Sequence, residues 1–259
     1  MSEVHSRLRL DQWLVEHKRV ASRSRARDLI LRGVVLIDGK ACRKAGRLVA
    51  DNAEVAISGA SDAGVHYVSR GALKLIAALD HFGIEPAGGA CLDIGASTGG
   101  FTQVLLERGA SVVFAVDVGT AQLAPGLRTD PRVKVLENQD ARRLDRTLVG
   151  VAPVLVTADV SFISLTQALP VALELAAPGA QLVALIKPQF EAGRAAIGKG
   201  GIVRTAEDRD AAVARVREWI AIQPGWRVLD VIPSPLEGKS GNTEFLLAAI
   251  KTGALADVR

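Results

Sequence analysis

From residue 71 onward, short apolar runs alternate with segments of helical periodicity, and this alternation limits the possible folds more than any other feature. The runs cover residues 90–94, 112–116, 133–136, 154–156, 182–186, 228–232 and 245–250, and the helical segments lie near 71–82, 99–108, 164–177 and 205–222. Strands that are apolar throughout and alternate with helices are typical of a parallel sheet covered on both faces. The sequence therefore predicts an α/β domain with a doubly wound, seven-stranded, mostly parallel sheet.

The cysteines and the apolar runs exclude several classes of protein. Only Cys42 and Cys91 occur in 259 residues, so we expect neither a disulfide framework nor a metal site. The polar residues 1–9 lack the apolar core of a secretory signal. No uncharged apolar run reaches the roughly 18 residues that span a bilayer. We therefore expect a cytoplasmic protein without a membrane partner.

Charge is divided unevenly along the chain. Residues 1–47 contain 12 Lys and Arg against 5 Asp and Glu, whereas the rest of the chain contains 20 against 23. A basic front part favours a polyanionic partner. The small and polar stretch 58–64 is typical of a linker. We predict a small α+β domain over residues 1–58, a linker over 59–70 and the larger domain over 71–259.

The front domain carries arginines at helical spacing. Leu10, Trp13 and Leu14 form the apolar stripe of one helix, and a second helical pattern ends at Gly33, before an apolar run at 34–37. Guanidinium groups bind phosphates bidentately, although exposed arginines can also be no more than a solvated helix face. The candidate RNA-binding residues are Arg9, Arg23, Arg25, Arg27 and Arg32.

This arrangement of residues 7–57 resembles the small alpha-L RNA-binding module first seen in a ribosomal small-subunit protein. The resemblance is carried by the order R-L-D-Q-W-L, then S-R-S-R-A-R-D-L-I-L-R-G-V-V-L-I-D-G-K. It implies binding to structured RNA through shape and backbone contacts, with little reading of bases.

A glycine-rich turn follows the first apolar run of the larger domain. The segment from Asp93 to Phe101 reads D-I-G-A-S-T-G-G-F, with Gly95 and Gly99 opening a helix. It resembles the S-adenosylmethionine site of Rossmann-like methyltransferases, since a dinucleotide fingerprint would be G-x-G-x-x-G. The candidate cofactor-binding residues are Asp93, Gly95, Gly99, Phe101, Asp117, Asp140 and Asp159.

Two of these carboxylates have specific expected roles. The resemblance implies that Asp117, at the end of the second strand, binds the ribose hydroxyls. Asp140, after the third strand, is placed to accept a hydrogen bond from the adenine amino group. Their alternative roles are a strand-end acid and a helix N-cap, respectively.

Four further polar residues resemble the catalytic set of the FtsJ-like 2′-O-ribose methyltransferases. They are Lys74, Asp159, Lys187 and Glu244, with P-Q-F following Lys187. The resemblance implies that Lys187 is the base that accepts the ribose hydroxyl proton, with its pKa lowered by burial and by Lys74. Asp159 is expected to orient Lys187 near the methyl donor, and Glu244 to pair with Lys74.

From about residue 7 to residue 250, the chain is similar to the TlyA/hemolysin A family of rRNA methyltransferases. The resemblance implies S-adenosylmethionine-dependent 2′-O-methylation of cytidine in 16S or 23S ribosomal RNA, or in both. Its expected partners are ribosomal RNA or ribosomal subunits. The alternatives are a membrane-active cytolysin, a non-catalytic ribosome-assembly factor and a small-molecule methyltransferase, which the basic front domain disfavours.

Overall fold

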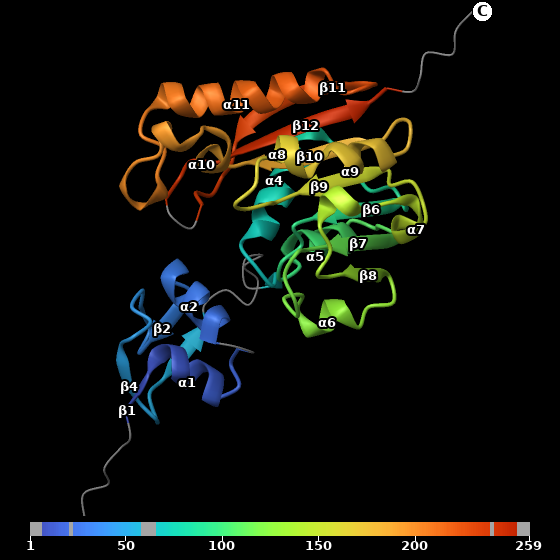
Figure 1. Cartoon of the computed structure of the whole chain (residues 1–259). Coiled ribbons are helices and arrows are strands. Elements are labelled where there is room, and N and C mark those ends of the chain that lie inside the picture. Colours follow the sequence, from blue (N-terminus) through green and yellow to red (C-terminus); the bar gives the residue numbers. More distant parts are fainter. Residues whose placement is uncertain (1–6, 21–22, 58–65, 239–240, 253–259) are drawn as a thin grey trace, which may run out of the picture. The chain divides into compact units, whose positions relative to one another are not determined.

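The chain divides into two compact units, Met1–Ser69 and Arg70–Arg259. The computed structural model describes residues 7–20, 23–57, 66–238 and 241–252 (Figure 1). The division falls inside the predicted linker 59–70, of which residues 59–65 lie outside the described residues. Each unit has its own buried apolar cluster and is described separately.

The small unit packs two helices against short strands. Its elements are β1 (Arg7–Arg9), α1 (Leu10–Glu16), α2 (Arg23–Arg32), β2 (Val35–Ile37), β3 (Lys40–Ala41), β4 (Leu48–Ala50) and β5 (Val55–Ile57). β1 pairs with β4, and β2 pairs with both β3 and β5. Leu10, Trp13 and Leu14 of α1 are buried against Leu29 and Ile30 of α2, as the apolar stripe predicts. The predicted α+β architecture is confirmed.

The large unit is built on one seven-stranded sheet. Its strands are β6 (Ala90–Ile94), β7 (Val112–Val116), β8 (Val133–Leu136), β9 (Leu155–Ala158), β10 (Gln181–Ile186), β11 (Trp226–Pro233) and β12 (Phe245–Lys251). Their order is β11-β12-β10-β9-β6-β7-β8, and the five strands from β10 to β8 are parallel. β6 and β9 are buried along their whole length, and apart from Asp93 and Thr157 they consist of apolar residues. The predicted doubly wound fold is confirmed.

β12 runs against its neighbours. It pairs antiparallel with both β10 and β11, and Phe245 at its start lies opposite Ile186 at the end of β10. Parallel strands present their carboxyl ends at one edge of the sheet, where such folds bind ligands. The reversal therefore brings the amino end of β12, and Glu244 just before it, to that edge.

Helices cover the sheet. They are α4 (Gly71–Phe82), α5 (Gly100–Glu107), α6 (Pro125–Arg128), α7 (Arg146–Val149), α8 (Leu165–Ala168), α9 (Pro170–Leu175), α10 (Pro188–Glu191) and α11 (Ala206–Ala221). Short 3-10 turns occupy Ala141–Arg143, Arg194–Ala196 and Lys199–Gly201. The prediction of a single helix over 164–177 is wrong: the segment forms α8 and α9, which meet at Pro170. Proline has no amide hydrogen to continue the helix and its ring clashes with the preceding turn.

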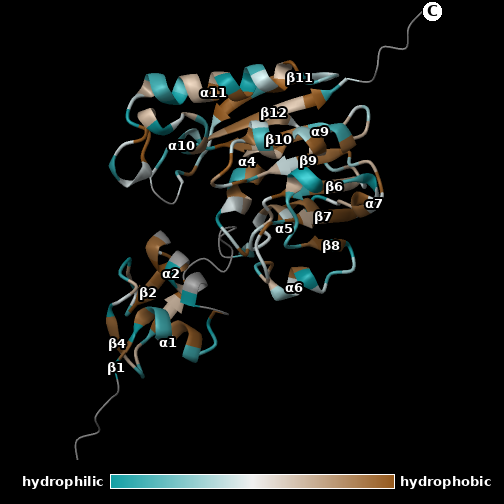
Figure 2. Cartoon of the chain, in the orientation of Figure 1, coloured by the Kyte–Doolittle hydropathy of each residue, from teal (hydrophilic) through white to brown (hydrophobic). Residues whose placement is uncertain are grey.

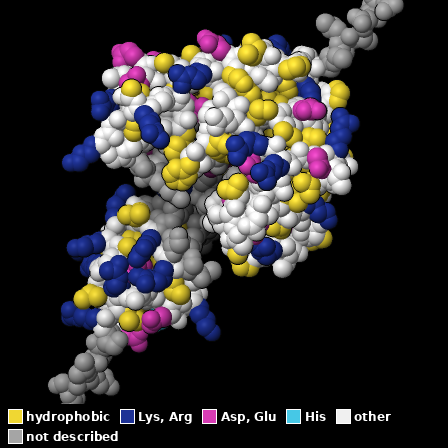
Figure 3. All heavy atoms as spheres, viewed as in Figure 1, with side chains coloured by type: hydrophobic (Ala, Val, Ile, Leu, Met, Phe, Trp, Pro, Cys, Tyr) yellow, Lys and Arg dark blue, Asp and Glu magenta, His cyan; other side chains and the backbone are white. Residues whose placement is uncertain are grey.

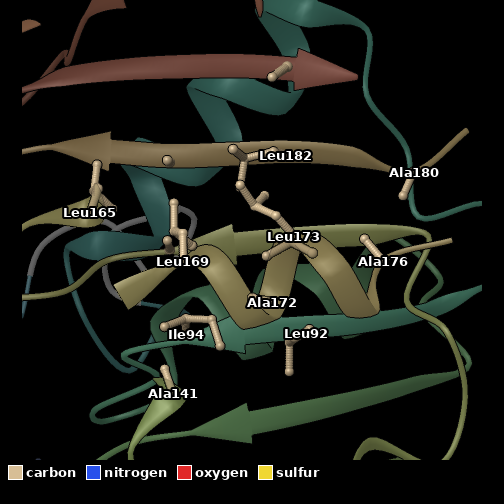
Figure 4. Close-up of a cluster of buried hydrophobic side chains, with 14 of the residues drawn as sticks. Leu92, Ile94, Ala141, Leu165, Leu169, Ala172, Leu173, Ala176, Ala180 and Leu182 are labelled. Atoms are coloured by element: carbon tan, nitrogen blue, oxygen red, sulfur yellow. The ribbon is translucent and has the colours of Figure 1, made fainter. Parts of the chain in front are cut away.

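The main core lies between the sheet and the α8–α9 segment. Leu92 and Ile94 of β6, Leu182 of β10, and Leu169 and Leu173 are all no more than 2% exposed. Figure 4 shows Leu173 and Leu182 extending toward each other across this layer. Figure 2 shows hydrophobic residues along the strands and many hydrophilic ones along α11. In the part of the chain that is described, no helix is both long and apolar enough to cross a membrane.

Candidate active site

The glycine-rich turn between β6 and α5 is shaped by close contacts with its surroundings. Gly95 (φ 82°) and Gly99 (φ 96°) both have left-handed backbones. A Cβ at Gly95 would lie 2.6 Å from the main-chain oxygen of Asp159, and one at Gly99 would lie 2.3 Å from Cδ1 of Leu127. A side chain at Gly95 would collide with the backbone, so the turn is held against the main chain at the end of β9.

Asp93 supports this turn from behind. Its side chain is fully buried, and its carboxylate accepts hydrogen bonds from the hydroxyls of Thr102 in α5 (2.7 Å) and Thr157 in β9 (2.9 Å). Burial raises the pKa of Asp93 to about 6, although these hydrogen bonds oppose the shift. A direct contact of Asp93 with a cofactor does not fit this burial. Phe101, only 3% exposed, is likewise placed as a packing side chain.

Asp117 reaches the turn from the end of β7. Its Oδ2 accepts from the Ser97 amide (2.8 Å), and its Oδ1 accepts from the Gly119 amide (2.7 Å). The carboxylate is half-buried and lies directly beside the glycine-rich turn. The sequence predicted Asp117 at the end of this strand, and its ribose-binding role stays a prediction.

Asp140 is the N-cap of a short 3-10 turn, the alternative role raised from the sequence. Its side chain accepts from the Arg142 amide at 2.9 Å and forms an ion pair with the Arg142 guanidinium at 2.6 Å. The side-chain hydrogen bond from Arg142 is the main reason that the pKa of Asp140 is lowered to about 2. An adenine contact through Asp140 thus stays a prediction, with Arg142 as a competing partner.

Glu137 was missed by sequence reasoning. It accepts hydrogen bonds from the amides of Ala121, Gln122 and Leu123 at 2.7, 3.0 and 3.2 Å, and it pairs with Arg128 at 2.6 Å. It therefore fixes the loop after β7, whose Leu123 side chain packs beside Gly99. The local sequence carries no sign of this role, because every partner lies at least nine residues away.

Two lysine–carboxylate pairs lie at the carboxyl edge of the sheet. Lys74 of α4 donates to Glu244, and both side chains are buried. Lys187, directly after β10, lies 2.6 Å from Oδ1 of Asp159 and donates to Oγ of Ser161 at 2.9 Å. The expected contacts of Glu244 with Lys74 and of Asp159 with Lys187 are present.

The pairing changes one sequence-based expectation. Lys74 was expected to act on Lys187 as a neighbouring cation, but Glu244 neutralises it. Lys74 is therefore the partner of a buried carboxylate and not an uncompensated cation. Oδ1 of Asp159 is buried and, among described residues, accepts no aligned hydrogen bond, so its ion pair with Lys187 leaves acceptor capacity unused.

Glu191 joins the two loops that carry this pair and was also missed. It is 5% exposed, and it accepts hydrogen bonds from the Leu165 amide (2.8 Å) and from the Ser164 hydroxyl (2.5 Å). Burial raises its pKa. The main-chain oxygen of Glu191 accepts from Arg215 of α11. This network ties α10, after Lys187, to the loop that begins at Asp159.

An exposed aromatic side chain stands in the same loop. Phe162 is 93% exposed, and its backbone has φ 66°, which residues other than glycine rarely adopt. Its ring centroid lies 5.2 Å from that of Phe190. An aromatic ring held in solvent, three residues after Asp159 and at a strained backbone position, points to use in binding.

In the small unit, three of the five RNA-binding candidates converge on one buried acid. Asp11 is fully buried and accepts hydrogen bonds from Arg9 (3.0 Å), Arg23 (3.1 Å) and Arg27 (2.9 Å). Burial alone would raise its pKa, but the three guanidinium groups together hold the pKa of this carboxyl well below its usual range. Figure 3 shows dark blue side chains gathered around a magenta one on this unit. Arg25 and Arg32 lie on α2, and their side chains lie outside the described residues.

The residues at the edge of the sheet fit S-adenosylmethionine. The turn at Gly95 and Gly99 opens α5, the Asp117 carboxylate lies beside this turn at the next strand end, and Asp159 has a buried oxygen whose neighbour is Lys187. A sulfonium cation with ribose hydroxyls and an amino group is chemically complementary to such a set. In the described part of the chain, no group of His, Cys, Asp and Glu could hold a metal ion.

Comparison with known proteins agrees with this geometry. The family model of FtsJ-like methyltransferases matches residues 67–251, and that of the S4 domain matches residues 8–55. The 16S/23S rRNA (cytidine-2′-O)-methyltransferase TlyA of Mycobacterium tuberculosis is 46% identical over 93% of this chain and 89% of its own length. Hemolysin A of Brachyspira hyodysenteriae is 39% identical over 92% of this chain and 98% of its own length.

Solved structures show the same relationship. A putative hemolysin from Streptococcus thermophilus has a TM-score of 0.74 and 38% identity, covering 96% of this chain and 90% of its own. An O-methyltransferase from Bacillus cereus in complex with SAH has a TM-score of 0.50 and 18% identity, covering 72% and 83%, which supports the fold alone. The chain therefore belongs to the FtsJ-like methyltransferase family, with an S4 domain in front of the methyltransferase domain.

Proposed function

We propose that this protein transfers a methyl group from S-adenosylmethionine to the 2′-hydroxyl of a cytidine in ribosomal RNA. One observation carries the proposal: the glycine-rich turn packs against the main chain of Asp159, whose side chain contacts Lys187. A cofactor on that turn and a base at Lys187 would thus share one edge of the sheet. The Mycobacterium tuberculosis relative named for this reaction matches 93% of this chain.

Binding of the cofactor is assigned to the backbone at Gly95 and Gly99 together with the Asp117 carboxylate. When bound, S-adenosylmethionine supplies an electrophilic methyl group on sulfur. Asp93 acts indirectly, because it holds the turn in shape through Thr102 and Thr157. Holding donor and hydroxyl in an attack geometry contributes a large part of the rate in such reactions.

Lys187 is assigned as the proton acceptor. In its neutral form, its Nζ would take the proton of the ribose 2′-hydroxyl as the oxygen forms its bond to the methyl carbon. Asp159 would then stabilise the resulting ammonium through the 2.6 Å contact. Glu244 and Lys74 form a buried pair that fixes α4 against the start of β12. They are positioning residues in this scheme.

Phe162 gives the site a surface for a nucleobase. A ribose hydroxyl can reach the base only when its nucleotide is presented out of a stacked helix, and aromatic side chains commonly stack on such splayed bases. The ring is exposed beside the catalytic loop and is supported by Phe190. The cytolysin alternative has only the names of relatives in its favour.

Variants of Lys187 test this proposal. Lys187→Ala and Lys187→Arg should both abolish methyl transfer in a single-turnover assay with ribosomal subunits and radiolabelled S-adenosylmethionine, because a guanidinium does not lose its proton at working pH. The affinity for the cofactor, measured by calorimetry, should stay within about twofold of the wild-type value, which is a small change in binding free energy. Lys134→Ala, an exposed lysine of β8, is the matched control and should retain activity.

Mapping ribose methylation in the treated RNA identifies the nucleotide. Substantial transfer by Lys187→Arg would refute the assignment of Lys187 as the base. Absence of methylation on both 16S and 23S RNA by the wild-type protein would refute the proposed substrate.

A further inference from the structure

The segment between α10 and α11 forms a compact hairpin. Ile197 and Val203 make an isolated antiparallel bridge, the Gly198 amide donates to the Ile202 oxygen at 2.7 Å, and the Arg204 amide donates to the Ala196 oxygen at 3.2 Å. Figure 1 shows this segment as the orange loop beside α10. We call residues 193–204 the basic hairpin. It begins six residues after Lys187.

A buried asparagine fixes the basic hairpin to the active site. Asn242 is 2% exposed; its Oδ1 accepts from the Val203 amide at 3.0 Å, and its Nδ2 donates to the Gly201 oxygen at 2.9 Å. Asn242 lies two residues before Glu244, which pairs with Lys74. The hairpin is therefore anchored by the same short segment that supplies Glu244, a positioning residue of the proposed site.

The charge of the basic hairpin is of one sign. Arg194, Lys199 and Arg204 are all exposed, and residues 192–204 contain no Asp or Glu. Within the described ranges, none of these three side chains is recorded in an ion pair. Arg108 and Arg132, by contrast, are neutralised by acids beside them. Three exposed cations without acidic partners give this element an attraction for anions.

The glycines of the basic hairpin leave its backbone bare. Gly193, Gly200 and Gly201 have φ values of 65°, 78° and 77°, and a Cβ built at any of them meets nothing within 4 Å. Steric crowding therefore does not explain the glycines at these three positions, whereas it does explain Gly95. A left-handed, open backbone between cations lets a ligand as large as a phosphate group approach closely.

We infer that the basic hairpin binds phosphate groups of the RNA substrate on either side of the target nucleotide. The inference rests on the proposed function for the identity of the substrate. In this inference the large unit contacts the RNA backbone itself, in addition to the RNA contacts expected of the small unit. Phosphate contacts fix the register of a nucleic acid without reading its sequence, which is what an active site needs from a neighbouring element.

The test compares two triple variants of the full-length protein. One carries Arg194→Gln, Lys199→Gln and Arg204→Gln. The matched control carries Lys134→Gln, Arg217→Gln and Arg227→Gln, which remove the same charge from exposed positions of β8, α11 and β11. Binding of 23S ribosomal RNA is measured against salt concentration, and methyl transfer is measured against RNA concentration.

The hairpin variant should lower the slope of log Kd against log salt by about 2 to 3, since each lost phosphate contact lowers it by roughly 0.7 to 0.9. Its KM for RNA should rise while its kcat and its affinity for S-adenosylmethionine stay unchanged. A third variant, with Arg194→Lys and Arg204→Lys, should keep the wild-type slope. A slope equal in the two triple variants would overturn the inference. If the wild-type protein bound the RNA without methylating it, the proposed function would fail, and the slopes would still decide the role of the hairpin.

Discussion

Asp11→Asn probes the arginine cluster of the small unit with a single-atom change. In the wild-type protein, three guanidinium groups donate to a fully buried carboxylate. A hydrogen bond to a charged group contributes about 1.5 to 3 kcal/mol to the free energy of unfolding. Because the arginine side chains are 42–53% exposed, we discount each bond to about 1 kcal/mol. The substitution should therefore destabilise the small unit by about 3 kcal/mol.

The dependence on pH follows from the direction of the pKa shift. The pKa of Asp11 is held below its usual range, so its contribution to stability is present above the unfolded-state value of about 3.9 and is lost as pH falls further. The difference between wild type and variant should be constant from pH 5 to pH 8. Hydrogen exchange in urea, followed on peptides from residues 7–57, measures it for this unit alone.

Binding to RNA gives a second readout, for which we expect a change in affinity opposite to the one that the charge difference alone predicts. Asp11→Asn removes a negative charge, which by itself would strengthen binding to RNA. We expect weaker binding, because an amide offers Arg9, Arg23 and Arg27 one neutral oxygen in place of the two charged oxygens that align them. The matched control is Asp51→Asn, whose exposed carboxylate contacts only His17 among described residues and should change stability by less than about 0.5 kcal/mol. Tighter binding and unchanged stability of Asp11→Asn would refute the reasoning.

Two further predictions concern the cofactor turn. The pKa of Asp93 is raised from 3.8 to about 6, so its ionisation destabilises the native state as pH rises through that range. In urea titrations, the free energy of unfolding of Asp93→Asn should therefore gain about 3 kcal/mol relative to that of wild type between pH 4 and pH 8. A difference that does not change with pH would contradict this. Gly95→Ala places a Cβ 2.6 Å from a main-chain oxygen and should weaken S-adenosylmethionine binding at least tenfold by calorimetry. Gly109→Ala has the same backbone strain (φ 87°) in open space, so it should be destabilising by about 1 kcal/mol with unchanged affinity for the cofactor.

The sheet could be predicted from the sequence because its central strands are buried on both faces. Such strands are largely apolar, as in β7 (VVFAV), and the runs therefore mark their positions directly. The helix over 71–82 also matches its prediction, since its apolar positions repeat at helical spacing and Gly83 ends it. The prediction of one helix over 164–177 failed at Pro170, because the apolar pattern continues through a residue that has no amide hydrogen for the helical hydrogen bond.

The residues that hold the site in shape could not be predicted. Asp11, Glu137, Glu191 and Asn242 all lie in locally ordinary sequence, and their roles depend on partners brought near only by the fold. Asp11 sits in an amphipathic helix and would pass as a solvated acid, yet its partner Arg27 is 16 residues away. The residues in contact with one another at the sheet edge, Lys187 and Asp159, were found through a family resemblance, which periodicity alone does not provide.

The reversed strand β12 has a consequence for the order in which this protein gains its function. β12 lies between β10 and β11, and Glu244 at its start meets a lysine 170 positions earlier in the chain. Contacts between such distant segments form late, because a long loop must close before they stabilise anything. A nascent chain that has emerged only as far as β11 has the cofactor turn, Lys187 and Asp159, but lacks the acid that neutralises Lys74. Catalytic competence should therefore appear in one step, when β12 enters the sheet, and partly made chains should be inactive.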